Sequence, residues 1–131
     1  MFVFAPRSGG RMFGKAALGD MVFDATNQTQ AAGSAAWEKT IQIRLEDSSG
    51  GLHEWFFGDV PISIADNSTA GTATIKDSTT HARFERGRAY VTVCGNAATW
   101  ASGEVVTLTV GSTTKILGAS VANKAVTVTI S

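Results

Sequence analysis

The sequence contains a single cysteine, Cys94, and shows no Cys or His spacing typical of a zinc site. One cysteine excludes an intramolecular disulfide. A chain of 131 residues is long enough to be stabilised by a hydrophobic core without such a cross-link. We therefore expect one folded unit in which the Cys94 thiol is buried and unreactive, as most free cysteines are.

Long hydrophobic runs are also missing. The apolar stretch at Phe2–Ala5 is followed at once by Pro6 and Arg7, and it is too short for the core of a secretory signal. No run approaches the roughly 18 apolar residues that span a bilayer. The sequence therefore predicts neither a secretory signal nor a membrane-spanning segment.

The chain has no excess of either charge, because 11 basic residues balance 11 acidic ones. The distribution is uneven, since residues 1–19 carry Arg7, Arg11 and Lys15 but no acid. Three cations are too few to indicate a nucleic-acid partner. We expect this basic segment to dock on an acidic or mixed protein surface.

A sustained helical period is absent, whereas alternation of apolar and polar residues recurs from Trp37 onward. The runs at 70–76 and 114–119 are weak, and the remaining ones are bounded by turn residues every 8–12 positions. This pattern predicts an all-β antiparallel sandwich of about seven strands. Strands are expected at residues 39–46, 52–57, 60–65, 70–76, 81–85, 88–94, 104–110, 114–119 and 124–130.

Three details of this assignment can be checked against a structure. Residues 39–46 and 52–57 are expected to form a hairpin across the Gly-rich turn between them. Pro61 has no N–H to donate, so we expect residues 60–65 to form an edge strand or a strand that starts at the edge of a sheet. Trp55 and Trp100 are expected in the core, since large aromatic side chains are usually buried.

Residues 1–36 differ from the rest of the chain in being rich in Gly, Ala and Gln, with apolar residues in scattered pairs. Only Phe2–Ala5 and Met21–Ala25 resemble strands, and Asn27–Ser34 is interpreted as a flexible connection. We expect an extended N-terminal arm at residues 1–36 and the sandwich at residues 37–131. The arm is either a disordered tail or a segment held by its own domain, by another copy of the chain or by a larger assembly. We favour the assembly, in which the arm adds a strand to a neighbouring protein.

The arm supplies most of the candidate partner-binding residues. Its apolar pairs would be seated on a partner and its cations would pair with acidic groups there, while Trp37 lies at the boundary between arm and sandwich and would anchor an interface. The predicted partner-binding residues are Phe2, Phe4, Arg7, Arg11, Met12, Phe13, Lys15, Met21, Phe23 and Trp37.

Catalytic and metal sites are not predicted. His53 and His81 lack a second ligand at helical spacing, and no paired nucleophile and base is evident. The loop carboxylates Asp47, Asp59 and Asp66 offer oxygen ligands for Ca²⁺ but do not have EF-hand spacing. We expect no catalytic residue, no cofactor and no resident metal.

The densest charge cluster contains Arg83, Arg86 and Arg88, and the last two would share one face of a strand. Such a cluster is typical of a solvated edge strand protected against aggregation. A partner-binding patch is the alternative interpretation.

Residues 37–131 resemble the immunoglobulin-like domains of tailed-bacteriophage virion proteins. The resemblance rests on turn and core positions that occur in the same order along the chain. These are a strand ending in Asp-x-x-Gly (Glu46–Gly50), His53-x-Trp55-Phe56-x-Gly58, Ser68-x-x-Gly71-x-Ala73, Phe84-x-x-Gly87-x-Ala89-x-Val91, Trp100, Thr107–Val110 and Ile116-x-Gly118.

This resemblance implies an immunoglobulin-like sandwich in a non-enzymatic virion protein, assembled in the host cytoplasm. It implies a capsid decoration or head-fibre base protein whose arm docks on the major capsid protein or another virion protein, and a homo-oligomer. The alternative is a tail- or fibre-associated module that binds carbohydrate weakly on the host surface. That role requires an exposed aromatic platform, for which Phe56 and Tyr90 are the outward-facing candidates.

Overall fold

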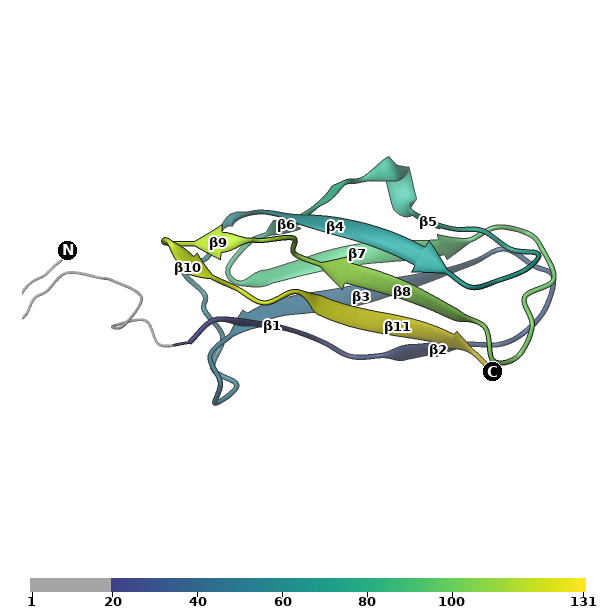
Figure 1. Cartoon of the computed structure of the whole chain (residues 1–131), viewed down its shortest axis with the longest axis horizontal. Coiled ribbons are helices and arrows are strands. Elements are labelled where there is room, and N and C mark those ends of the chain that lie inside the picture. Colours follow the sequence, from purple (N-terminus) through teal and green to yellow (C-terminus); the bar gives the residue numbers. More distant parts are fainter. Residues whose placement is uncertain (1–19) are drawn as a thin grey trace, which may run out of the picture.

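Alternating apolar and polar residues build two β-sheets that face each other across a common core. The computed structural model describes residues 20–131, and it shows an all-β sandwich (Figure 1). Its strands are β1 (Val22–Ala25), β2 (Gln28–Gln30), β3 (Trp37–Glu46), β4 (Gly58–Asp66), β5 (Ala73–Ile75), β6 (His81–Phe84), β7 (Arg88–Gly95), β8 (Val105–Val110), β9 (Lys115–Ile116), β10 (Ala119–Ser120) and β11 (Lys124–Ile130). One short 3₁₀ turn, η1 (Lys76–Ser78), lies between β5 and β6.

The order of the strands is that of an immunoglobulin-like domain. One sheet has the order β1-β3-β7-β5, and the other has the order β2-β11-β8-β4-β6. The first order corresponds to the A-B-E-D arrangement of immunoglobulin sandwiches, and β11-β8-β4-β6 corresponds to G-F-C-C′, with β2 as an additional edge strand beside β11. The chain departs from that fold because the strand in the D position, β5, precedes the strand in the C′ position, β6, and because β9 and β10 form a separate two-stranded sheet.

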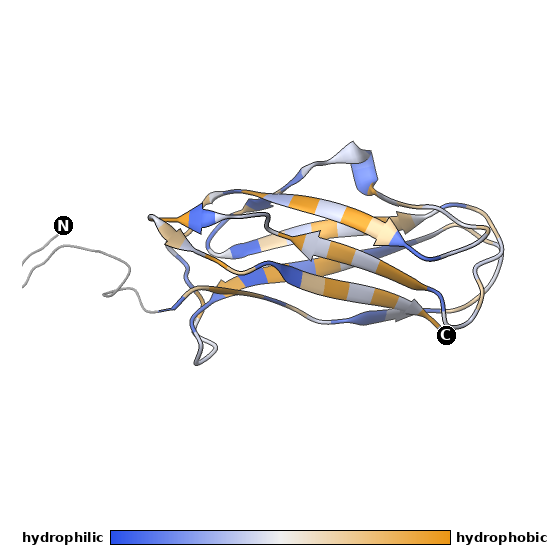
Figure 2. Ribbon diagram, viewed as in Figure 1, coloured by the Kyte–Doolittle hydropathy of each residue, from blue (hydrophilic) through white to orange (hydrophobic). Residues whose placement is uncertain are grey.

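The core lies between the sheets and is made by every second residue of the strands (Figure 2). In β3, β7, β8 and β11 the inward positions expected from the alternation are buried, so this part of the prediction is confirmed. Trp100 is 1% exposed and packs edge-on against Trp37, with ring centroids 5.3 Å apart. Phe84 is fully buried, and its ring centroid lies 5.7 Å from that of Phe23 and 5.3 Å from that of Phe56.

The sandwich begins earlier than residue 37. β1 pairs antiparallel with β3, as in Val22 opposite Glu46, and β2 pairs parallel with β11, as in Gln28 opposite Val128. The prediction of a strand within Met21–Ala25 is confirmed, but the assignment of Asn27–Ser34 as a flexible connection is wrong at β2. The boundary at residue 36 is therefore corrected, since residues 22–30 supply an edge strand to each sheet. Short polar strands such as β2 carry too little alternation to be recognised in isolation.

The predicted hairpin between residues 39–46 and 52–57 is wrong. Beyond the turn, only an isolated bridge joins Glu46 to Leu52, and residues 53–57 form a loop. β3 instead pairs with β1 and β7, which are distant in sequence. The alternation within β3 predicted a strand correctly, but it contained no information about the neighbouring strand.

The strand order places β4 between β8 and β6, so the edge-strand alternative is wrong. Pro61 lies directly before the residues that pair with β8, which agrees with the alternative that the strand starts at an edge. β4 pairs with β6 through Gly58–Pro61 and with β8 through Ile62–Asp66, so each half of the strand has one paired neighbour. Pro61 sits where one pairing gives way to the other, and its carbonyl accepts a hydrogen bond of 2.7 Å from Gly111. A proline is tolerated at this junction because the ladder does not require its missing N–H.

Candidate functional site

Exposed apolar side chains gather at one end of the sandwich, which we call the apolar end. There, Trp55, Phe57 and Leu117 are 38%, 61% and 59% exposed. The three side chains line a single depression of about 300 Å³ between the loop at residues 53–57 and the β9–β10 hairpin. Its remaining lining residues include Asp59, Thr114 and Lys115. The chain enters the sandwich at this same end (Figure 1).

His53 joins the chain entry to the loop that carries the aromatic residues. The His53 side chain is 6% exposed, and its Nε2 lies 2.6 Å from the carbonyl oxygen of Asp20. The indole Nε1–H of Trp55 donates to Nδ1 of His53 at 3.1 Å. Nδ1 is then an acceptor, which leaves Nε2–H to donate to Asp20, as a neutral imidazole requires. His53 is thus a buried, hydrogen-bonded side chain, and its ring orients Trp55 beside residue 20.

The loop keeps Phe57 outside because Phe56 is turned inward. Phe56 packs on Phe84 in the core, its N–H donates to His53 and its carbonyl accepts from Gly87 at 2.9 Å. The expectation that Phe56 is an outward platform is wrong, and so is the assignment of Trp55 to the core. Three consecutive aromatic residues cannot all face one side, and the loop buries only the middle one.

The β9–β10 hairpin presents Leu117 in an unusual backbone conformation. Leu117 and Gly118, its two connecting residues, have φ of 52° and 78°. Positive φ at both positions defines a type I′ turn, which strongly prefers Asn or Asp followed by Gly. A leucine is a rare choice there, both because its Cβ disfavours this region and because the side chain is exposed to water.

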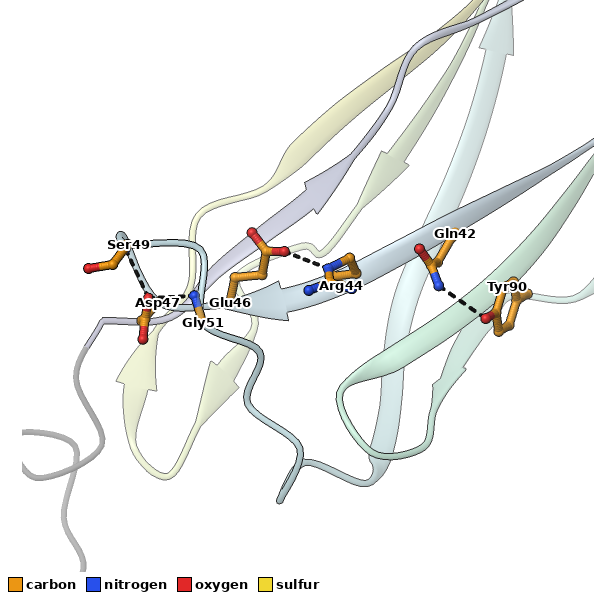
Figure 3. A network of polar contacts seen from close by, with 7 residues as sticks. All are labelled: Gln42, Arg44, Glu46, Asp47, Ser49, Gly51 and Tyr90. Atoms are coloured by element: carbon orange, nitrogen blue, oxygen red, sulfur yellow. Dashed lines mark hydrogen bonds and ion pairs between the residues drawn. The ribbon is translucent and has the colours of Figure 1, made fainter.

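A second, polar surface covers the outer face of the β1-β3-β7-β5 sheet (Figure 3). Tyr90 is 65% exposed, and its hydroxyl accepts a hydrogen bond of 3.0 Å from the Gln42 amide. Arg44 forms an ion pair with Glu46 on the same face. The predicted exposure of Tyr90 is confirmed, and among the aromatic residues predicted to form a carbohydrate platform this ring is the exposed one.

The predicted partner-binding residues divide into two sets. The members that precede residue 20 lie outside the described residues; they are Phe2, Phe4, Arg7, Arg11, Met12, Phe13 and Lys15. The other set belongs to the sandwich itself: Met21 is half-buried against the core, while Phe23 and Trp37 are 5% and 7% exposed. Assigning Phe23 and Trp37 to a partner surface is wrong, because pairing of β1 and β3 places both side chains between the sheets.

The loop carboxylates considered as calcium ligands are engaged elsewhere. Asp47 accepts hydrogen bonds from the N–H groups of Ser49 and Gly51 (Figure 3). Asp66 accepts from the N–H groups of Ser68, just after β4, and of Ala73, at the start of β5, and Asp59 lies 3.7 Å from Arg83. Among residues 20–131 no cluster of three or more His, Cys, Asp or Glu side chains is placed to hold a metal ion.

The arginine cluster follows the edge-strand interpretation in part. β6, which carries Arg83, is the edge of its sheet. Arg86 does not share a strand face with Arg88, because Arg86 and Gly87 form the tight turn between β6 and β7, with φ of 54° and 81°.

The helical segment that the structure describes is too short to cross a membrane.

Within residues 20–131, two side chains have a perturbed pKa. The pKa of Glu104 is lowered because its carboxylate accepts hydrogen bonds from the N–H of Ala101, the hydroxyl of Ser68 and the N–H of Thr69. These bonds tie the loop before β8 to the loop after β4. The pKa of the half-buried Cys94 thiol is raised by burial and then by the nearby Glu38 carboxylate, so this thiol is poorly suited to act as a nucleophile.

Comparison with known proteins adds no family: no family model and no curated protein matches this chain.

The sequence did not predict that the residues lining the apolar end would lie together. Two signals marked them. The run Trp55-Phe56-Phe57 does not alternate, and Leu117-Gly118 occupies a turn position at which a polar residue is usual.

Proposed function

We propose that this protein is a non-enzymatic structural component of a tailed-bacteriophage virion, a capsid decoration or head-fibre base protein that docks on the shell through residues 1–19. The proposal rests on the resemblance of residues 37–131 to virion immunoglobulin-like domains. It is supported by the sandwich fold, which offers a stable body that projects from an attachment point.

The observation that carries the proposal is the coincidence of two features at one end of the molecule. The basic, apolar segment 1–19 joins the sandwich at Asp20, beside the exposed Trp55 and Phe57. Exposed aromatic residues are enriched at protein interfaces. The opposite end would then face solvent, as a decoration protein requires.

Attachment is assigned to the apolar and basic residues of the segment. Phe2 and Phe4 would enter apolar seats on the major capsid protein or another virion protein while the backbone adds to a sheet edge there. Arg7 and Arg11 would pair with acidic groups around those seats. Several copies around one attachment point would form the expected homo-oligomer.

The deciding experiment compares the full chain with a variant that lacks residues 1–19. The deletion stops before Asp20 because residues 22–25 form β1 and contribute Phe23 to the core. Each protein is added to virions that lack the native copy, and bound protein is measured after sedimentation. We expect the full chain to bind and the truncated chain, folded by circular dichroism, to remain in the supernatant; equal binding by the two would refute attachment through this segment.

A second candidate function is a tail- or fibre-associated module that binds host-surface carbohydrate. It is favoured by the exposure of Tyr90 beside Gln42, since an aromatic ring flanked by a hydrogen-bonding amide suits a sugar face. A glycan array probed with the full chain and with Tyr90→Ala tests it. Binding that is lost in the variant would support this function, and an array without hits would remove it.

A further inference from the structure

The apolar depression is open to solvent and has room for the side chains of a bound segment. It exposes two aromatic residues and a leucine to water, and its volume of about 300 Å³ lies at the lower limit for small-molecule sites. Space of this size suits one or two apolar side chains of a polypeptide. Most proteins do not leave such groups exposed together without a partner.

We propose that Met12 and Phe13 of the same chain occupy this depression, with their side chains against Trp55, Phe57 and Leu117. The described chain starts at Asp20, whose carbonyl is bound by His53, next to Trp55. Residues 14–19 separate the Met12-Phe13 pair from this point. Six residues span at most about 20 Å when extended, which places the pair within reach of a depression that Trp55 itself lines.

Leu117 gives an independent reason to expect an occupant. Its backbone has φ of 52° and its side chain is 59% exposed, so this residue has an unfavourable conformation without the compensation of burial. Backbone outliers of this kind persist where the residue serves a contact. An apolar side chain seated between Leu117 and Trp55 would bury both.

Charge is a minor factor in this contact. The Met12-Phe13 pair lies between Arg11 and Lys15, and the aromatic loop lies between Glu54 and Asp59. Cations are already present at the depression, because Lys115 lines it and Arg83 approaches Asp59. We therefore expect the occupancy of the depression to depend only weakly on salt concentration, because the apolar contact dominates.

The connection within one chain favours self-occupancy over a second copy. Two groups joined by six residues of one chain are held at an effective concentration of about 1 mM. A segment with an intrinsic Kd in that range would fill the depression about half of the time, whereas a second copy at micromolar concentration would not compete. The inference does not depend on the proposed function, but it assigns Trp55 and Phe57 to a contact within the chain. Docking on the shell would then rest on Phe2, Phe4 and Arg7.

Disulfide trapping in the full-length chain tests the contact. In a Cys94→Ser background, Gly14→Cys is combined with Lys115→Cys, at the depression, or with Ser49→Cys, in the exposed turn after β3. Val22 pairs with Glu46, so residue 14 of a segment that is not bound in the depression would meet residue 49 at least as readily as residue 115. We expect the 14–115 cross-link to form within the monomer at least fivefold faster than the 14–49 cross-link.

Matched substitutions identify the anchoring residues. Met12→Ser with Phe13→Ser should bring the two cross-linking rates together, whereas Phe2→Ser with Phe4→Ser should leave the difference intact. Equal rates in the parent protein, or a 14–115 cross-link found only between two chains, would overturn the proposal; the second result would identify another copy as the occupant. Loss of virion binding in Phe2→Ser/Phe4→Ser with unchanged trapping would show that the two contacts are separate.

Discussion

Gly87 supports the loop that presents the apolar end, and its replacement by alanine gives the sharpest prediction. The residue has φ of 81°, and its N–H donates to the carbonyl of Phe56. A Cβ placed on Gly87 would lie 2.5 Å from the carbonyl oxygen of His53 and 3.1 Å from Leu52 Cδ1. The close approach to His53 is to backbone, so a change of side-chain rotamer cannot relieve it.

Two costs add in Gly87→Ala. A non-glycine residue in the left-handed region costs about 1–2 kcal/mol, and insertion of a methyl group into occupied space costs about 1–3 kcal/mol. We expect the free energy of unfolding to fall by about 2–5 kcal/mol. Gly103→Ala is the matched control, since Gly103 has φ of 93° but nothing within 4 Å of its Cβ position, and it should lose only the first cost.

Urea unfolding of the two variants measures the difference. With a slope of about 1.5–2 kcal/mol per molar urea, Gly87→Ala should lower the unfolding midpoint by about 1–3 M, and Gly103→Ala by about 1 M or less. Acrylamide quenching of Trp55 should also increase in Gly87→Ala, as the loop shifts away from His53. Equal midpoints for the two variants would show that the contact between Gly87 and the loop is not the constraint we infer.

Three further predictions concern burial and acidity. Phe84→Ala should cost about 3–5 kcal/mol of stability in urea while Phe57→Ala costs about 0.5 kcal/mol or less, because the first ring is fully buried and the second is 61% exposed; similar losses would contradict this assignment of core and surface. The lowered pKa of Glu104 means that its hydrogen bonds add stability above the ordinary pKa of 4.5, and that this stability is lost as the pH falls through the folded pKa. The destabilisation by Glu104→Gln should thus be larger at pH 7 than at pH 3, and a pH-independent difference would refute it. Because the pKa of Cys94 is raised, its alkylation by iodoacetamide at pH 7, followed by mass spectrometry, should be slower than that of free cysteine, and an equal rate would contradict the burial.

Strand positions were predictable where alternation was strong. In β7, Ala89, Val91 and Val93 face the core as expected, and β8 and β11 follow the same rule. A period of two residues reports which face is buried, because successive side chains point to opposite sides of a sheet. It does not report which strand is adjacent, and the hairpin assigned to residues 39–57 failed for that reason.

The candidate site was less predictable than the fold. Trp55 was assigned to the core from its residue type alone, yet it is held outside by the hydrogen bond of its indole to His53. Phe23 and Trp37 were assigned to a partner surface, yet they are core residues. Whether a large aromatic side chain is buried depends on what packs against it, and local sequence does not contain that information.

The sequence by itself determined the all-β class, the inward faces of the long strands and the concentration of cations in residues 1–19, because each of these follows from local periodicity or composition. The tertiary structure alone decided that residues 22–30 complete both sheets and that Trp55, Phe57 and Leu117 meet at one depression. These three residues are brought together by pairing between strands far apart in the chain. That pairing depends on the packing of the whole core.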